Sequence, residues 1–172
     1  MELRLLIPDD AEPWWHLRLE ALRNDSVSFA ASADEHLQTT VATARERLNK
    51  NDPTSNFVVG MFEDGQLAAT AGFYRDSHIK ERHKGHIWGV YVRPQSRGKG
   101  VARALLQEII RRATEIDGLE QILLVASAHL PARKLYESLG FTAYGVEPKS
   151  LKIHSEKTGT EYVDDVLMIL WL

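Results

Sequence analysis

A short run of cations and glycines is the part of the sequence best suited to bind an anion. It consists of Arg97, Gly98, Lys99 and Gly100, and an amphipathic segment follows it from Val101. Backbone N–H groups at the first turn of a helix can bind a phosphate, and the helix dipole favours its negative charge. Glycine leaves those groups uncovered, while arginine and lysine add positive charge. The run predicts a diphosphate site, although two glycines alone would also suit an ordinary turn.

The segments on either side predict the elements that would position this run. His86–Val92 has the composition of a strand, and Arg93-Pro94 ends it. Val101–Ile116 predicts an amphipathic helix with Val101, Leu105, Ile109 and Ala113 on its apolar face, closed by Asp117-Gly118. A strand, a glycine-bearing loop and a helix start would therefore follow one another.

Apolar patterns and turn residues predict the remaining elements. We expect strands at Glu2–Ile7, Asn56–Phe62, Gln66–Tyr74, Ile122–Val125 (covered on both faces), Phe141–Val146 and Val163–Leu172. We expect helices at 11–22, Val41–Leu48 and Leu130–Leu139. The expected loops are 23–34, Arg75–Gly85 and Glu147–Gly159. The Asp64-Gly65 pair predicts a hairpin turn. The expected fold class is α/β, with one mixed sheet and helices on both of its faces.

Length and composition restrict the classes of protein that fit. The 172 residues suffice for one domain, which we expect to span residues 1–172. A net charge of −3 argues against nucleic acid or a membrane as partner. The absence of cysteine excludes disulfides, thiolate zinc sites and a cysteine nucleophile. No apolar run reaches the roughly 20 residues that span a bilayer, and the start of the chain is unlike a secretory signal, so we expect a cytoplasmic protein.

Two motifs resemble those of a known family. Gln95–Gly100 matches the pattern Q/R-x-x-G-x-G/A, and Ala132–Phe141 resembles A-x-x-L-Y-E-x-x-G-F. In this order they are typical of the GNAT superfamily of acetyl-CoA-dependent N-acyltransferases. The P-loop and dinucleotide-binding patterns, the nearest phosphate-binding alternatives, are both absent. The resemblance implies a GNAT-like fold, whose mostly antiparallel sheet has a central pair of splayed strands, and acetyl-CoA as the acetyl donor.

The resemblance also implies which residues hold the coenzyme. The strand before the signature would pair with the pantetheine arm like an added strand, with Gly89 at an associated bulge. His129 stands where the family often has asparagine, which leaves the usual amide contact in question. Arg133 or Lys134 could reach a coenzyme phosphate, although a solvated charge on a short helix is the simpler interpretation. The full set of expected cofactor contacts is Val90, Tyr91, Val92, Arg97, Gly98, Lys99, Gly100, Val101, Ala102, His129 and Lys134.

Three residues are candidates for the chemistry of acetyl transfer. Tyr136 could protonate the leaving thiolate, since a phenol pKa of about 10 lies above the roughly 8.5 of a thiol; the alternative is a tyrosine that only packs on the sheet. The backbone N–H of Val90 could stabilise the thioester oxygen. His86 could accept the proton of the amine, although an ordinary surface histidine is the simpler interpretation. Glu35 is a weaker candidate for the same role.

These residues favour direct transfer to a primary amine within a ternary complex, because no cysteine is present to form an acyl-enzyme. The alternative function is a sensor or structural domain that binds acetyl-CoA without catalysis. The acceptor, a small-molecule or peptide amine, cannot be read from the sequence. No metal is expected, because no ligand spacing of a metal site is present. Dimers are common in the family, which leaves a homodimer open.

Overall fold

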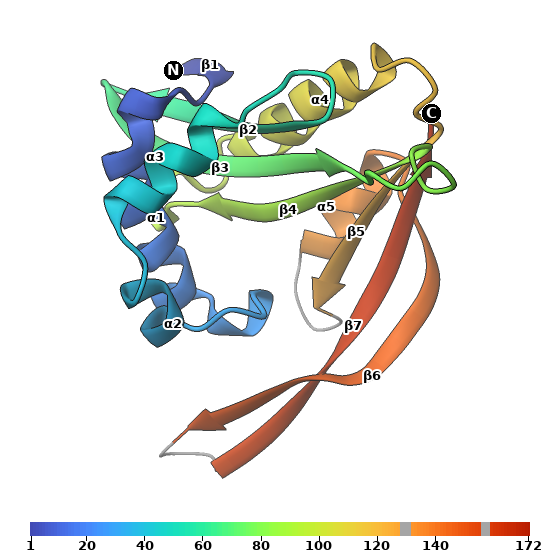
Figure 1. The fold of residues 1–172 in the computed structure, drawn as a ribbon. Helices are drawn as coiled ribbons and strands as arrows, with labels where there is room; N and C mark the ends of the chain where they lie inside the picture. The colour runs from blue at the N-terminus through green and yellow to red at the C-terminus, as the bar shows by residue number, and fades with distance from the viewer. Residues whose placement is uncertain (128–131, 156–158) are drawn as a thin grey trace.

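The fold is built on one mixed sheet (Figure 1). The computed structural model describes residues 1–127, 132–155 and 159–172. In these residues seven strands follow the order β1-β2-β3-β4-β5-β7-β6, and every neighbouring pair is antiparallel except β4 and β5. The strands are β1 (Glu2–Leu5), β2 (Asn56–Glu63), β3 (Gln66–Arg75), β4 (Lys84–Val92), β5 (Gln121–Ser127), β6 (Thr142–Ser155) and β7 (Gly159–Trp171). The predicted fold class is confirmed.

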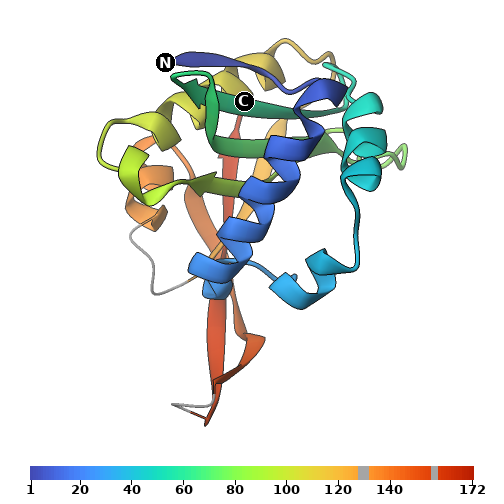
Figure 2. The same ribbon diagram turned by 90° about the vertical axis from the view of Figure 1, so that its left-hand side faces the viewer.

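Helices cover both faces of the sheet. They are α1 (Ala11–Asn24), α2 (Ala33–Leu37), α3 (Val41–Asn49), α4 (Val101–Thr114) and α5 (Ala132–Ser138). On one face, α1 and α3 bury residues such as Leu17 and Leu48 against Val58 of β2. On the other, α4 and α5 bury residues such as Ile109 and Tyr136 against the sheet. Figure 2 shows α1 crossing the first of these faces, with α4 behind the sheet.

The two central strands separate soon after they meet. β4 and β5 are paired in parallel only where Lys84–His86 lies beside Gln121–Leu123. Beyond that point the edge of β4 has no strand partner among the described residues, and Figure 1 shows the two strands diverging. The expected splayed pair is therefore present, and it opens the sheet at its centre.

A bulge in β4 lies just beyond the point of separation. Gly72 pairs with Trp88 and Thr70 with Tyr91, so two residues of β4, Gly89 and Val90, stand opposite one residue of β3. Gly89 has φ +64°, a conformation that favours glycine. The predicted bulge at Gly89 is confirmed, and it changes the direction of the strand at the open edge.

The prediction of a loop at Glu147–Gly159 was wrong. β6 runs to Ser155 and β7 begins at Gly159, so the two strands form a long hairpin that extends beyond the rest of the sheet (Figure 1). Leu151 and Ile153 alternate with Lys152 and His154 in this segment, but this alternation is too short to predict a strand of such length. A shift of register between Glu147 and Leu151, where Lys149 has φ +56°, interrupts the ladder. Polar residues at this irregularity concealed the strand.

Smaller departures from the expected elements concern solvent exposure and short turns. Val125 of β5 is 57% exposed, so the strand is not covered on both faces as expected. The segment 23–34, expected to be a loop, contains a 3-10 turn at Ser26–Ser28 and the first residues of α2. The loop between β3 and β4 is shorter than the expected Arg75–Gly85 at both ends, because β3 includes Arg75 and β4 begins at Lys84. Within the described ranges, no helix is long and apolar enough to cross a membrane.

Candidate functional site

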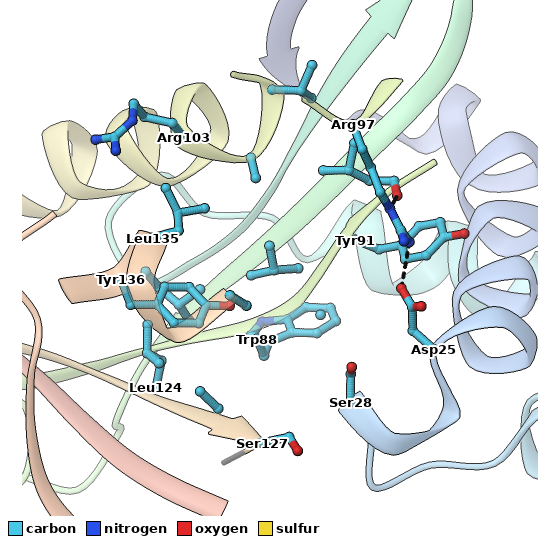
Figure 3. Close-up of a pocket in the computed structure, with 18 of the residues that line it drawn as sticks. Asp25, Ser28, Trp88, Tyr91, Arg97, Arg103, Leu124, Ser127, Leu135 and Tyr136 are labelled. Carbon is cyan, nitrogen blue, oxygen red and sulfur yellow. Dashed lines mark hydrogen bonds and ion pairs between the residues drawn. The ribbon is translucent and has the colours of Figure 1, made fainter. Parts of the chain in front are cut away.

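A cavity of about 490 Å³ lies where β4 and β5 separate (Figure 3). Its lining comes from the outer part of β4, the loop and helix start that follow, the end of β5, the face of α5 and the turn after α1. The lining includes residues 87–92, Ser96, Arg97, Gly98, Gly100–Arg103, Leu124–Ser127, Ala132, Leu135, Tyr136, Asp25, Ser28 and Phe29. Most of the predicted cofactor residues therefore line one cavity.

The start of α4 offers backbone N–H groups at one edge of this cavity. Gly98 and Gly100 have φ +75° and +80°, and no atom lies within 4 Å of the place where a side chain would begin. Among the residues that the structure describes, the N–H groups of residues 98–103 have no acceptor, and Gly100 caps the helix without a side-chain hydrogen bond. Unpaired N–H groups at a helix start are the donors that phosphate groups bind. The geometry thus matches a site for a diphosphate.

The two cations of the signature are directed toward carboxylates of the chain itself. Arg97 Nη2 lies 2.7 Å from Asp25 Oδ2, and its Nε donates to the carbonyl of Val92 at 2.9 Å. Figure 3 shows the Arg97 side chain reaching across to Asp25. Lys99 Nζ lies 2.9 Å from Glu63 Oε1, and this hydrogen bond is the main cause that lowers the pKa of Glu63. The predicted contacts of Arg97 and Lys99 with a phosphate require exchange of these ion pairs.

The end of β4 is fixed to the end of α1. The hydroxyl of Tyr91 donates to Glu20 Oε1 and accepts from Asn24 Nδ2, both at 3.1 Å. Arg93 Nε donates to Glu20 Oε2 at 3.0 Å. The buried Tyr91 ring belongs to the core beneath α1, so the backbone of the strand, rather than this side chain, is available to a ligand at the splayed edge.

Tyr136 enters the cavity from α5. The residue is 8% exposed, its ring meets Phe141 edge to face at 6.1 Å, and Figure 3 shows its hydroxyl pointing toward Trp88 across the cavity. Burial raises the pKa of Tyr136 to about 12. The phenol is therefore fully protonated at neutral pH, as a proton donor must be. Tyr136 can serve both in packing and as a proton donor, because its ring packs against Phe141 while its hydroxyl faces the cavity (Figure 3).

Val90 and the bulge lie at the middle of the cavity lining. Neither Gly89 nor Val90 has a partner residue in the register between β3 and β4. The side chain of Val90 packs against the core on the α4 side, which leaves its backbone at the open edge of the strand. This is the arrangement that the proposed contact with a thioester oxygen requires.

His86 and Glu35, the two candidate bases, are both engaged elsewhere. His86 Nε2 lies 2.9 Å from Asp76 Oδ2, and the ring stacks on Tyr74 at 4.6 Å. His86 does not line the cavity, although its neighbour Ile87 does. The carboxylate of Glu35 accepts from the N–H of Ser32 at 2.7 Å and closes the capping box of α2. Geometry therefore gives neither residue direct contact with the space beside Tyr136.

Lys99 and Lys134, both predicted cofactor contacts, are not among the residues that line the cavity. His129 falls outside the described residues. Lys134 is exposed on α5. Its expected contact with a phosphate of the coenzyme stays a prediction.

Sequence reasoning missed several residues that form the walls. Arg103 lies one turn into α4, and its Nη2 donates to Ser138 Oγ of α5 at 2.7 Å. Asp25 and Ser28 come from a segment that carries no motif. Only the tertiary structure reveals their position, because Asp25 pairs with Arg97, which lies 72 residues later in the sequence. Arg103 could have been found as a cation one turn beyond the signature.

Metal-ligating side chains are not gathered here. In the described part of the chain, no three histidine, aspartate or glutamate residues come close enough together to hold a metal ion. The polar groups of the lining residues are backbone amides, hydroxyls, the Trp88 indole N–H, the Arg103 guanidinium and the Arg97–Asp25 pair.

Comparison with known proteins agrees with this geometry. Residues 10–141 match the acetyltransferase (GNAT) family, and this span is more than three quarters of the chain. The chain belongs to the GNAT acetyltransferase family. The matched span begins before α1 and includes both sequence motifs, the splayed strands and all five helices.

Solved structures share the fold over almost the whole chain. An acetyltransferase of the GNAT family from Streptococcus pneumoniae is 21% identical, with a TM-score of 0.87 and 99% of each chain covered. A GNAT superfamily phosphinothricin acetyltransferase from Sinorhizobium meliloti, in complex with acetyl-CoA, is 22% identical, with a TM-score of 0.81 and coverage of 99% of this chain and 88% of that one. A GCN5-related N-acetyltransferase from Kribbella flavida is 23% identical, with a TM-score of 0.79 and coverage of 99% and 97%. At these identities the likeness establishes the fold of the GNAT family member.

Proposed function

We propose that residues 1–172 act as one domain that transfers the acetyl group of acetyl-CoA to a primary amine by direct attack in a ternary complex. The observation that carries the proposal is the row of unpaired N–H groups at residues 98–103, at the edge of the cavity that Tyr136 enters. A coenzyme with a diphosphate and a narrow flexible arm fits this combination of an anion site and an open strand edge. The S. meliloti relative, solved with acetyl-CoA, supports the same donor.

The chain's own residues suit the coenzyme. The N–H groups of Gly98–Ala102 would hold its diphosphate, because the open space at both glycines lets phosphate oxygens come close to the backbone. The free edge of β4 at Val90–Val92 would hydrogen-bond the pantetheine arm. Arg97 and Lys99 add charge if the phosphates displace Asp25 and Glu63 from them. His129 and Lys134 remain further proposed contacts.

The proposed chemistry needs a polarised carbonyl and a proton donor. When bound, acetyl-CoA supplies an activated thioester. The N–H of Val90 stabilises the negative charge that develops on the thioester oxygen. As the amine nitrogen forms its bond to the acetyl carbon, the carbon–sulfur bond breaks and the Tyr136 hydroxyl gives its proton to sulfur. Burial keeps this phenol protonated, so the donor is ready at neutral pH.

The amine must lose a proton before or during attack, since an alkyl ammonium with a pKa of about 10 has no lone pair. His86 is proposed to accept that proton through water, because the structure places it one residue before the cavity lining and pairs it with Asp76. The pH–rate profile of His86→Ala tests this role. An unchanged profile would exclude it.

Thiol release tests the proposed function directly. Because the chain has no cysteine, a thiol reagent added to the protein and acetyl-CoA detects coenzyme A with no background from the protein. We expect release that depends on a primary amine, and no burst of thiol when the amine is omitted. Acetyl-CoA binding without release for any amine of a broad panel would instead establish the non-catalytic sensor. Absence of binding would refute both.

A further inference from the structure

A second cavity of about 100 Å³ lies between α1, α2, α3 and β4. It shares Trp88 with the larger cavity, and Arg18, His36 and Arg47 also line it. Every residue of its lining is basic, aromatic, small or a threonine, so the described lining contains no acid. A volume of 100 Å³ equals that of about three water molecules in the liquid, enough for a small polar group.

Arg18 connects the two cavities. Its Nη1 atom is inaccessible to solvent and has no hydrogen-bond partner among the described residues. That atom lies 3.4 Å from the position that a Cβ of Gly89 would occupy, and the guanidinium lies 4.9 Å above the ring of Phe29. Gly89 and Phe29 both line the larger cavity. Arg18 therefore stands beside the bulge where acetyl transfer is proposed.

Arg47 brings a second positive charge to the same place. Its guanidinium lies 4.1 Å from the centre of the Trp88 ring and 5.9 Å from that of Trp14. Arg47 as a whole is exposed, so its guanidinium lies against the indoles at the mouth of the cavity. The Nε1–H of Trp88 is itself buried without an acceptor. Two guanidinium groups and an indole N–H thus belong to residues that line one small cavity, whose described lining contains no acid.

The electrostatics of this pair are unfavourable without a counter-ion. Desolvation lowers the pKa of Arg18, and the charge of Arg47 lowers it further; desolvation also lowers the pKa of Arg47. A guanidinium remains charged in proteins all the same, so two like charges stay close together. Neither arginine side chain forms an ion pair with the described residues, and the buried Nη1 of Arg18 has no hydrogen-bond partner among them. Stacking on aromatic rings offsets part of the cost, but it does not satisfy a buried N–H.

We propose that the acceptor of the acetyl group is a free amino acid, whose carboxylate binds between Arg18 and Arg47. This inference rests on the proposed function. A guanidinium matches the two oxygens of a carboxylate with paired N–H groups, and Trp88 Nε1 supplies a further donor. With the carboxylate in the small cavity, the amine extends past Gly89 into the larger one. A polyamine or a lysine-rich surface is disfavoured, because its charge repels both arginines.

Matched acceptors give the first test. The twenty L-amino acids are compared with their amides and with the corresponding decarboxylated amines in the thiol-release assay. We expect an amino acid to be acetylated with a kcat/KM at least roughly 10-fold above that of its amide, since loss of a charged hydrogen-bond partner has about this effect. Aminophosphonates and aminosulfonates form a second arm, which shows whether another oxyanion is preferred over carboxylate. Equal rates for amino acids, amides and amines would overturn the proposal while leaving the proposed function intact.

Substitution of the two arginines gives the second test. Arg18→Gln and Arg47→Gln should each lower kcat/KM for the preferred amino acid by roughly 10- to 100-fold, while the Kd of acetyl-CoA stays unchanged. The control is Arg45→Gln, on the same helix as Arg47 but on the surface, where it pairs with Asp9. Its kinetics should match those of the native protein. An equal effect of all three substitutions would contradict specific binding of the carboxylate.

A measurement without turnover separates this inference from the proposed function. The amino acid should raise the melting temperature of the native protein, and less so that of Arg18→Gln. Arg18→Lys, which keeps the charge but not the planar fork, serves if the glutamine variant does not fold. If no amine is acetylated but the amino acid still stabilises the native chain, the carboxylate site is supported and the proposed enzymatic function is refuted. If acetylation occurs but neither the carboxylate nor the arginines influence it, the proposed function is supported and the carboxylate site is refuted.

Discussion

The substitution of Gly100 by alanine tests whether the start of α4 binds the coenzyme through its backbone. Gly100 has φ +80°, and a Cβ there would meet no atom within 4 Å. Alanine therefore fits the space but not the backbone conformation, which costs an L-residue roughly 1–2 kcal/mol. We expect Gly100→Ala to lower the free energy of unfolding by about this amount, or the melting temperature by about 2–8 °C for a chain of this size.

Gly65 provides a control with the same strain at a distant place. It has φ +77°, no atom lies within 4 Å of its Cβ position, and it occupies the turn between β2 and β3. Asp64 beside it also has a positive φ, of +51°, as in the type I′ turn of a two-residue hairpin. Gly65→Ala should therefore lower stability about as much as Gly100→Ala. The two variants differ only in whether the strained residue adjoins the unpaired N–H groups.

Coenzyme binding should distinguish the two variants. If Gly100→Ala relaxes by leaving the left-handed conformation, the N–H groups of residues 98–103 no longer converge, and binding must restore the strained loop. The part of the 1–2 kcal/mol that relaxation spares the free protein then appears in binding instead, and full relaxation would weaken the Kd for acetyl-CoA by about 5- to 30-fold. Calorimetric titration measures this change, and Gly65→Ala should leave the Kd unaltered. An equal loss of affinity in both variants, or a Gly100→Ala variant in which neither the stability nor the Kd changes, would refute the reasoning.

Three further predictions follow from Tyr136 and Trp88. Tyr136→Phe should lower kcat by about 10²- to 10⁴-fold with little change in the Kd of acetyl-CoA. The control Tyr144→Phe, on the exposed part of β6, should change neither quantity. An equal kcat in the two variants would show that Tyr136 takes no part in the chemistry. Because burial raises the pKa of Tyr136 to about 12, the unfolded chain loses this proton first, at about pH 10. Urea unfolding should therefore show the native protein losing stability between pH 10 and 12, with up to about 3 kcal/mol from Tyr136. Tyr136→Phe should lose less, and the remaining loss comes from groups such as Tyr91, whose pKa burial also raises. Gly72→Ala would place a methyl group against the indole of Trp88, which lines the second cavity. Steady-state kinetics should therefore show a larger rise in KM for the amine than for acetyl-CoA. The opposite order would contradict the assignment of the second cavity to the acceptor.

Local signals explain why much of the fold could be predicted. The apolar face of α4 recurs at helical spacing, and Val101, Leu105, Ile109 and Ala113 are all buried as expected. The Asp64-Gly65 turn depends on two adjacent residues, and the signature Gln95–Gly100 on six. In each case the residues that decide the structure are neighbours in the sequence, so their pattern could be interpreted without knowledge of the rest of the chain.

The parts that could not be predicted depend on distant residues. Arg97 and Lys99 carry the charge expected of a phosphate site, but their partners Asp25 and Glu63 lie 72 and 36 residues away. The β6–β7 hairpin was missed because polar residues at the register shift between Glu147 and Leu151 interrupt the apolar pattern of β6. The exposed edge of β5 at Val125 likewise follows from the splaying of two strands, which no single segment encodes.

The acceptor cavity shows the same limit most clearly. Arg18 and Arg47 lie on different helices, and each taken alone resembles a solvated surface cation, so only the packing of α1 against α3 reveals that they share a space without an acid.

Two different means of binding anions meet at β4, and their difference bears on selectivity. At the start of α4 the signature cations Arg97 and Lys99 are paired with the chain's own acids, so the N–H groups of residues 98–103 form a row of unpaired donors. Such a row suits the several oxygens of a diphosphate better than one carboxylate. In the second cavity the unpaired donors are two guanidinium groups in about 100 Å³, too little space for a diphosphate bearing its nucleoside. On the proposals made above, shape therefore keeps the coenzyme out of the acceptor cavity, and the Asp25 and Glu63 ion pairs reduce the attraction of the acceptor to the coenzyme loop. Neutralising Asp25 by Asp25→Asn would release Arg97, and an amino acid acceptor should then inhibit competitively against acetyl-CoA, an effect absent from the native protein if this division is correct.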